Sequence, residues 1–494
     1  MLILDIFVCS LMIVDYNKPF TVLFGLVAAI LLLPSLTSHG MFMDGIQYAV
    51  VSKNLAHGIG EFWFPFLSTS WAKQNLMYFM EHPPLFYYLE SLFFKLFGDG
   101  FLTERIFCIT FFILNVTIIH ILWHKIKARL NLSINSWLPL LLWIITPTVY
   151  WAFTNNMIEI VGSFLVLVGV NSSYEIYFTE DRLSKIKHIL VLSFSLCLGF
   201  LTKGIPMAFP VISVICFQII YKHKSWKETL VLLVSIIAIP ILFFTLLVSL
   251  NDKAAMSLGF YLKERLFFRV SNEPQVDNRF VVIFWLISDL LVPIGLIVLA
   301  LIIQKALKLK GQFNQASRNI FYSFLLIGMA GVLPLALTKV QRAVYYLPAI
   351  SIIAIALSVY ASRIFSTLFD KWRLSARVYS GCYKLLSYGL IFFVFLNVYY
   401  YGRVFRDEKV LEEVHKIGKG IGSSKTMEVD YDTYLKWDFQ FYLLRYYDIR
   451  MNPWGMESKD FVLIPKKKGL QSKYYLEFQS LNLNEYYLYR KIRN

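Results

Sequence analysis

Two carboxylates lie at the edges of long apolar runs, where a hydrophobic chain rarely carries charge. Asp44 follows the first such run, in the stretch MFMDGIQYAVVSKNLAHG, and Glu159 opens a later run directly after Thr154, Asn155 and Asn156. A carboxylate just outside a membrane span can act as a general base towards a hydroxyl group. A solvated loop acid or helix cap also explains Asp44, and a favourable charge at a helix N-terminus also explains Glu159. For either residue alone, these structural explanations have more weight.

Several cations interrupt other apolar runs. Lys203 lies in GFLTKGIP, Arg265 lies in YLKERLFFR, and Lys339, Arg342 and Tyr345 lie in TKVQRAVYYLP. A lysine between two membrane spans is costly unless it is paired or reaches water, so anion binding and snorkelling to the interface are equally good explanations. The planar guanidinium of arginine fits a pair of phosphate oxygens, and simple interfacial anchoring is the alternative.

A further polar pair precedes two prolines, in Glu81-His82-Pro83-Pro84. The residue before a proline favours an extended backbone, so this segment is explained structurally as a turn. Because two prolines also fix the direction of the chain, they would present the Glu81 and His82 side chains rigidly.

The composition places these groups in a membrane protein. Of 494 residues, 57% are hydrophobic and 16% are charged, and the mean hydropathy is +0.58. In soluble domains, about half of the residues are hydrophobic and about a quarter are charged. Disorder, collagen and a disulfide-rich secreted scaffold are excluded. We expect the five cysteines to be small buried hydrophobic residues, because all lie in apolar stretches and no pair has metal-ligand spacing. They are Cys9, Cys108, Cys197, Cys216 and Cys382.

The apolar runs predict an all-α polytopic protein with about 11 to 13 transmembrane helices, since about 20 apolar residues cross a bilayer. Residues 1–14 are too short to span, and the amphipathic run 84–97 is predicted to lie flat on the interface. The eleven candidate spans are 20–38, 101–123, 136–153, 157–178, 188–203, 205–221, 229–250, 280–303, 319–337, 341–361 and 381–401.

The net charge of +16 is explained mainly by membrane orientation. Lys and Arg are concentrated in alternate short connections, which predicts a cytoplasmic N-terminus and makes a nucleic-acid partner unnecessary. The basic connections are 124–129, 179–188, 222–228, 304–318 and 362–378. The first outer loop is then 39–100. Residues 403–494, charged and rich in Tyr, are predicted to form a small α/β extracytoplasmic domain with a helix over 438–447 and a strand over 459–465.

These motifs, in this order and spacing, resemble the GT-C superfamily of membrane glycosyltransferases. The nearest branch is similar to the protein O-mannosyltransferase and lipid A aminoarabinose transferase group, over roughly residues 20–350. Any one motif is weak, but four in the correct order on the predicted outer face form a strong signal. They are Asp44 with Tyr48 and Leu55–Gly58; Glu81-His82-Pro83-Pro84-Leu85 with Tyr87-Tyr88, Phe97-Gly98 and Arg105; Leu198-Gly199, Thr202-Lys203-Gly204 and Pro210; and Lys339 with Tyr345-Tyr346-Leu347-Pro348.

The resemblance implies a GT-C fold in residues 1–402 and transfer of a polyprenyl-phosphate-linked sugar, with inversion, to a lipid, glycan or protein at the outer face. Asp44 matches the catalytic acid of the family, and Glu159 matches the acid of the second outer loop. Lys203, Lys339, Arg342 and Tyr345 match positions that line the donor phosphate. His82 and Arg265 complete the candidate phosphate site.

Three residues depart from the family pattern. Gly45 stands where many relatives have a second acid, and His82 stands where many have Lys, so its charge depends on pH. The loop before 280–303 lacks the usual His, and Asp277 is among the nearest polar residues. Glu81 matches an acid that in some members helps to hold a metal. Glu81 with Asp277 leaves a divalent cation open, and no cofactor is assigned.

We therefore expect a glycosyltransferase in a bacterial inner membrane, with its active face and C-terminal domain in the periplasm. Asp44 would be the base and Glu159 a helper, since no nucleophilic Ser or Cys arrangement is visible. A transporter or flippase of lipid-linked sugars is the alternative, but it predicts internal repeats and midspan charges that are not evident. A lipid-binding assembly subunit without chemistry is a second alternative.

Overall fold

The computed structural model describes residues 17–69, 77–268, 274–309, 313–372, 376–454, 461–469, 475–477 and 481–491. Residues 1–14, predicted not to span, and Cys9 therefore lie outside the described residues. Within them, nine helices are long and apolar enough to cross a membrane. They are α2 (Lys18–Leu36), α5 (Thr103–Leu130), α8 (Glu159–Phe178), α9 (Arg182–Lys203), α11 (Trp226–Leu250), α14 (Val281–Ala306), α15 (Gln315–Val332), α16 (Leu347–Trp372) and α17 (Ala376–Tyr399).

Two of the eleven predicted spans are broken. Helices α6 (Trp137–Ile144) and α7 (Pro147–Thr154) meet at 78° and make a tenth span only if they are counted together. Pro147 causes the break, because it holds the preceding Thr146 in an extended conformation.

The second broken run is a 3₁₀ segment, η1 (Ile205–Ile212), followed by the short helix α10 (Ser213–Tyr221). Pro206 and Pro210 lack the N–H groups that a continuous α-helix needs. The expected 11 to 13 spans are thus reduced to nine or ten in the described part of the chain.

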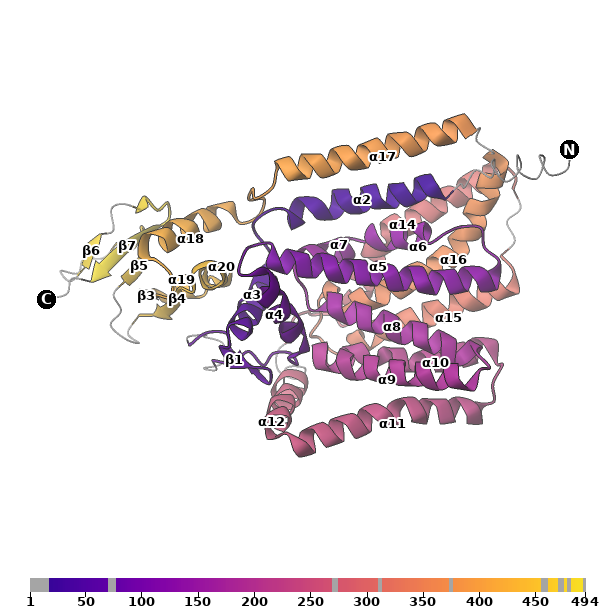
Figure 1. Cartoon of the computed structure of the whole chain (residues 1–494), viewed down its shortest axis with the longest axis horizontal. Coiled ribbons are helices and arrows are strands. Elements are labelled where there is room, and N and C mark those ends of the chain that lie inside the picture. Colours follow the sequence, from indigo (N-terminus) through magenta and orange to yellow (C-terminus); the bar gives the residue numbers. More distant parts are fainter. Residues whose placement is uncertain are drawn as a thin grey trace.

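The long helices run side by side, and the segments that carry the candidate residues gather at one end of the bundle (Figure 1). The first outer loop forms α3 (Met43–Ala56), a small hairpin of β1 (Gly60–Glu61) and β2 (Phe64–Pro65), and α4 (Leu85–Phe97). Helix α4 covers the run predicted to be interfacial. The loop after α11 forms α12 (Asp252–Phe260) and a π-helical segment, η2 (Tyr261–Phe268).

The C-terminal region packs against the same end of the bundle (Figure 1). It contains α18 (Glu408–Ile421), α19 (Tyr431–Tyr434), α20 (Trp437–Tyr447) and a five-stranded sheet of order β4-β3-β5-β7-β6. The strands are β3 (Thr426–Val429), β4 (Arg450–Pro453), β5 (Phe461–Pro465), β6 (Tyr475–Glu477) and β7 (Tyr486–Lys491). Strand β3 is parallel to β4 and β5, whereas β7 is antiparallel to β5 and β6. The predicted helix and strand are present as α20 and β5, while the predicted boundary at residue 402 stays a prediction.

Burial divides the spans into central and peripheral helices. Helices α8 and α16 are mostly buried inside the molecule, whereas α11 and α17 are almost entirely exposed. The exposed side chains of α11 and α17 include Leu242, Phe392 and Phe395, which is the pattern of a lipid-facing surface. Cys382 on α17 is exposed, so the expectation that all five cysteines are buried is wrong for this residue.

Candidate functional site

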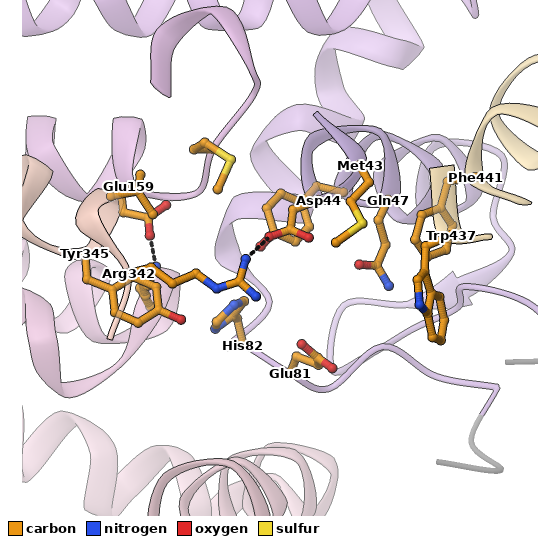
Figure 2. A pocket seen from close by; sticks show the side chains of 14 residues that line it. Met43, Asp44, Gln47, Glu81, His82, Glu159, Arg342, Tyr345, Trp437 and Phe441 are labelled. Atoms are coloured by element: carbon orange, nitrogen blue, oxygen red, sulfur yellow. Dashed lines mark hydrogen bonds and ion pairs between the residues drawn. The ribbon is translucent and has the colours of Figure 1, made fainter. Parts of the chain in front are cut away.

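A polar pocket opens where the first outer loop, the bundle and α20 meet. It encloses about 740 Å³ of empty space, including the solvent at its mouth. Figure 2 shows most of its charged side chains pointing toward one another. The lining residues are Met43, Asp44, Gln47, Tyr48, Glu81, His82, Met157, Glu159, Lys203, Arg342, Val344, Tyr345, Trp437 and Phe441. The structure thus brings both predicted carboxylates together with four of the six predicted donor-phosphate residues.

Asp44 lies in the first turn of α3, and the loop before α8 holds that turn in place. The backbone N–H of Phe42 donates to Asn155 Oδ1 at 2.8 Å, and Asn156 Nδ2 donates to the carbonyl of Gly45 at 3.2 Å. The carboxylate of Asp44 faces Arg342, with 3.5 Å between Oδ2 and Nη1. Asp44 is therefore fixed by its backbone while its side chain reaches the pocket.

Arg105 does not line the pocket, but it holds together the two loops that carry Asp44 and Glu159. Its side chain is 2% exposed and donates to the carbonyls of Ser38, Gly40 and Thr154. These carbonyls belong to the two loops that lead into Asp44 and Glu159. One buried guanidinium thus ties together the segments that carry the two carboxylates.

The packing around Gly45 explains the missing second acid. A Cβ atom at this position would overlap the backbone oxygen of Asn155. Backbone cannot yield as a flexible side chain can, so the close approach of the Asn155–Asn156 turn excludes any side chain after Asp44.

Glu159 and Lys203 form a buried ion pair rather than two separate charges. Their side chains are 1% and 7% exposed, and Lys203 Nζ donates to Glu159 Oε1. The ammonium group also lies 4.2 Å from the centre of the Tyr345 ring. Desolvation makes such a pair costly unless both charges have further partners, and removing either partner would strand the other.

The break after Lys203 is set by the next residue. Gly204 has a φ of +80°, and a Cβ atom there would overlap the hydroxyl of Tyr261, which donates to the carbonyl of Lys203 at 3.1 Å. Lys203 therefore sits in the last turn of α9, where a cation is favoured by the helix dipole.

Arg265 reaches the pocket region from η2 and pairs with Glu81, with 3.1 Å between Nη2 and Oε1. Its Nε is buried without a hydrogen-bond partner among the described residues. Asp277, the suggested metal partner of Glu81, does not line the polar pocket. Among the described residues, no group of three or more His, Cys, Asp or Glu could hold a metal ion. The described part of the chain therefore does not fit a metal site at Glu81.

The segment before α16 separates the two predicted cations Lys339 and Arg342. Gln341 anchors it by donating to the carbonyls of Arg279, Leu335 and Thr338, at 2.6 to 3.0 Å. Arg342 then points into the pocket, whereas Lys339 is exposed and does not line it. A role of Lys339 at the donor phosphate stays a prediction that this arrangement does not support.

A largely apolar groove of about 1330 Å³ continues from the polar pocket along η1 and η3 (Leu333–Leu337). It shares Glu81, His82, Lys203 and Tyr345 with the pocket, and Arg265 lies on its wall. Its apolar walls include Phe209, Val211, Ile212, Ala330, Pro334 and Leu335. Charged groups therefore stand at the head of a groove suited to a hydrocarbon chain.

Comparisons with known proteins identify a similar family over part of the chain and a similar fold over nearly all of it. Residues 81–248 match the family model of dolichyl-phosphate-mannose-protein mannosyltransferases. The fold matches ArnT from Cupriavidus metallidurans bound to undecaprenyl phosphate, with a TM-score of 0.64 over 96% of this chain and 98% of that one. The chain therefore has the fold of ArnT, and one third of it resembles this mannosyltransferase family. The apo state of the same ArnT gives a TM-score of 0.61 over 95% and 97% of the two chains. Sequence identity is 12% in both cases, and no curated protein sequence matches.

Sequence reasoning missed several residues that support or close the pocket. Gln47 lies one turn after Asp44 on α3, and helical spacing could have found it. Trp437 and Phe441 come from α20 in the C-terminal region, about 390 residues from Asp44, and no local pattern links them to the pocket.

Glu90 on α4 is a fourth missed residue, and it lies behind the pocket. It is fully buried, and it accepts hydrogen bonds from Ser52 and Asn156, both at 2.7 Å. Burial raises the pKa of Glu90 to about 8, against the opposing effect of these hydrogen bonds. Through Asn156, this carboxyl group supports the turn that carries Asp44.

Proposed function

We propose that this protein is an integral-membrane glycosyltransferase that moves a sugar from a polyprenyl-phosphate donor to an acceptor hydroxyl, with inversion. The observation that carries the proposal is the junction of the pocket and the groove. Lys203, Arg265, His82 and Tyr345 stand where an apolar groove meets a pocket that contains a carboxylate. A lipid-linked sugar phosphate has this order of groups, from hydrocarbon through phosphate to sugar.

The donor phosphate would lie beside Lys203, Arg265 and Tyr345. The buried Nε of Arg265 has no partner among the described residues, and a phosphate oxygen would supply one. Arg342 is 43% exposed, so it can leave Asp44 and turn to the phosphate when the donor enters. The undecaprenyl phosphate bound to the ArnT structure of the same fold supports this class of donor.

Asp44 would act as the general base. It accepts the proton of the acceptor hydroxyl while that oxygen attacks the anomeric carbon, and the phosphate leaves with the electron pair of the broken bond. The cations stabilise the charge that develops on the leaving phosphate. Glu159 is buried against Lys203, so its role is to hold the lysine in place.

The pocket would face the periplasm of a bacterial inner membrane. The connections rich in Lys and Arg join helices at the end of the bundle opposite the C-terminal region, which supports a cytoplasmic location for them.

The decisive experiment compares cell envelopes by mass spectrometry with and without the gene, and then with the gene restored as Asp44→Asn. We expect a sugar modification that is lost on deletion, with transfer by the Asp44→Asn protein reduced about 10²–10⁴-fold. Asp252→Asn, at an exposed acid in the first turn of α12, is the matched control and should restore the modification.

The same Asp44→Asn protein, purified in nanodiscs, should still bind undecaprenyl phosphate. A flippase or an assembly subunit would keep its function without this carboxylate. Normal envelope modification in Asp44→Asn cells would therefore refute the proposed catalytic role.

A further inference from the structure

The C-terminal region supplies part of the pocket wall. Trp437 and Phe441 lie one turn apart on α20, with 6.1 Å between their ring centres, and both line the pocket. Figure 2 shows them beside Gln47, on the far side of Asp44 from Tyr345 and Glu159. Phe441 is 2% exposed, while Trp437 is only partly buried and faces the cavity.

Helix α20 is fixed to the first outer loop and the bundle, so this wall is not a mobile lid. Arg445 is fully buried and pairs with Glu104 at 2.7 Å between Nη2 and Oε2. It also donates to the carbonyls of Asp99 and Gly100, both at 2.9 Å. Burial and three partners in the stretch from Asp99 to Glu104 fix the position of this guanidinium.

A second contact fixes the same helix next to the catalytic turn. The hydroxyl of Tyr442 accepts from the backbone N–H of Met41 at 2.8 Å and lies 2.9 Å from the Met41 carbonyl. Met41 is only three residues before Asp44. The position of Trp437 relative to Asp44 is therefore set by buried contacts rather than by a flexible linker.

The two ends of the pocket differ in chemistry. The end near Tyr345 and Lys203 opens into the apolar groove, which in the proposed function holds the donor lipid. The opposite end offers an indole face and the Gln47 amide, and the Glu81 carboxylate, which also lines the groove, lies between the two ends. With the donor at the first end, the second end is left for the acceptor.

We infer that Trp437 and Gln47 form a subsite for a sugar ring of the acceptor, which makes the acceptor a glycan. A sugar ring has an apolar C–H face that can lie on an indole and a rim of hydroxyls that needs both donors and acceptors. The indole supplies the first, and the amide of Gln47 with the carboxylate of Glu81 supplies the second. This inference rests on the proposed function.

The location of the subsite favours a glycan over a lipid or a peptide. Helix α20 belongs to the C-terminal region beyond the end of the bundle, so an acceptor that passes it lies in water (Figure 1). An extended peptide needs backbone hydrogen-bond partners along its length, such as an open strand edge. The wall here is a helix rather than an open strand edge, and it lines the pocket with the side chains of Trp437 and Phe441.

The test measures sugar binding to the full chain in nanodiscs made from lipids without sugar headgroups. Saturation-transfer NMR would use the methyl glycosides of mannose, glucosamine and galactose as probes, and a blocked Ala-Ser-Ala peptide as the competing class. We expect at least one glycoside to bind the wild-type protein at millimolar concentration. Trp437→Ala should weaken that binding about tenfold or more, while Trp437→Phe should retain most of it.

Trp454→Ala is the matched control, because Trp454 is an exposed tryptophan of the same region that does not line the pocket. It should leave glycoside binding unchanged, and all three variants should bind undecaprenyl phosphate normally. The inference is overturned if no glycoside binds, if Trp437→Ala binds it as tightly as the wild type, or if only the peptide binds. These outcomes leave the Asp44 experiment unaffected, so the two proposals can fail separately.

Discussion

At the scale of single residues, the pocket is organised by pairs of opposite charge. Arg342 faces Asp44, Lys203 holds Glu159, and Arg265 holds Glu81. Of the three cations, Arg342 is the most exposed, at 43%, and it pairs at the longest distance. Arg342 is thus the cation that can change partners most easily when an anion enters.

Arg342→Ala should weaken the binding of undecaprenyl phosphate about tenfold or more, since a hydrogen bond to a charged group contributes about 1.5–3 kcal/mol. Lys339→Ala removes a cation only three residues away that does not line the pocket, and it should have little effect. Both variants can be measured by titrating the lipid into nanodiscs that contain the protein. Equal effects of the two variants would indicate general attraction to the membrane surface.

Glu90 leads to a prediction about pH. Burial raises the pKa of Glu90 from its usual 4.5 to about 8, so the folded protein holds this proton more tightly than the unfolded chain does. The contribution of this proton to folding stability is fully present below about pH 4.5, and it is lost as the pH rises through about 8. Glu90→Gln has no proton to lose and can still accept from Asn156.

Thermal unfolding between pH 6 and 9 should therefore show the Tm of Glu90→Gln rising relative to that of the wild type as the pH increases. The difference should level off above pH 8. A difference that is constant across this range would mean that Glu90 does not titrate as a buried acid.

At the scale of elements, helices begin or end next to the charged residues that line the pocket. Helix α9 ends at Lys203 because Gly204 adopts a positive φ, and η1 continues with two prolines instead of an α-helix. Helix α3 starts just before Asp44 because the Asn155–Asn156 turn binds its first backbone groups. Each break places a charged side chain at the end of the bundle.

Gly45→Ala tests the contact between α3 and this turn. The added methyl group would overlap the carbonyl of Asn155, so we expect a loss of about 1–3 kcal/mol in stability together with a loss of transfer. Gly259→Ala is a suitable control, because Gly259 lies in helix α12 with no atom within 4 Å of an added Cβ. Alanine there should be neutral or slightly stabilising, as its helix propensity exceeds that of glycine. A normal Tm for Gly45→Ala would show that the turn can move.

At the scale of the whole molecule, the pocket belongs to both the bundle and the C-terminal region. Asp44, Lys203 and Arg342 come from three parts of the membrane domain, and Trp437 comes from α20. The buried pair of Arg445 and Glu104 joins these two parts. Losing this contact would open the pocket without changing any residue that lines it.

Glu104→Ala should destabilise the protein by about 3–5 kcal/mol, because it leaves the Arg445 guanidinium buried without its counter-charge. Glu412→Ala breaks a solvent-exposed i,i+4 pair with Lys416 and should leave the Tm nearly unchanged. Thermal unfolding and limited proteolysis of the C-terminal region would compare the two. Equal protease resistance would mean that other contacts suffice to hold the region in place.

The sequence alone determined the membrane class, the positions of the long helices and the order of the charged motifs. It did so because twenty-residue apolar runs and charged residues at their ends are local signals. Of the eleven predicted spans, the described residues contain nine or ten, since the bend at Pro147 and the 3₁₀ segment after Gly204 depend on how the helices pack. It also named Asp44, Glu159, Lys203 and Arg342, all of which line one pocket.

Only the tertiary structure decided which of these charges meet. It paired Glu159 with Lys203 and Asp44 with Arg342, left Lys339 exposed, and separated Glu81 from any cluster of metal ligands among the described residues. It also brought Trp437 to Asp44 from the other end of the chain. The physical reason is that contacts between distant segments depend on packing and burial, and no spacing along the sequence records them.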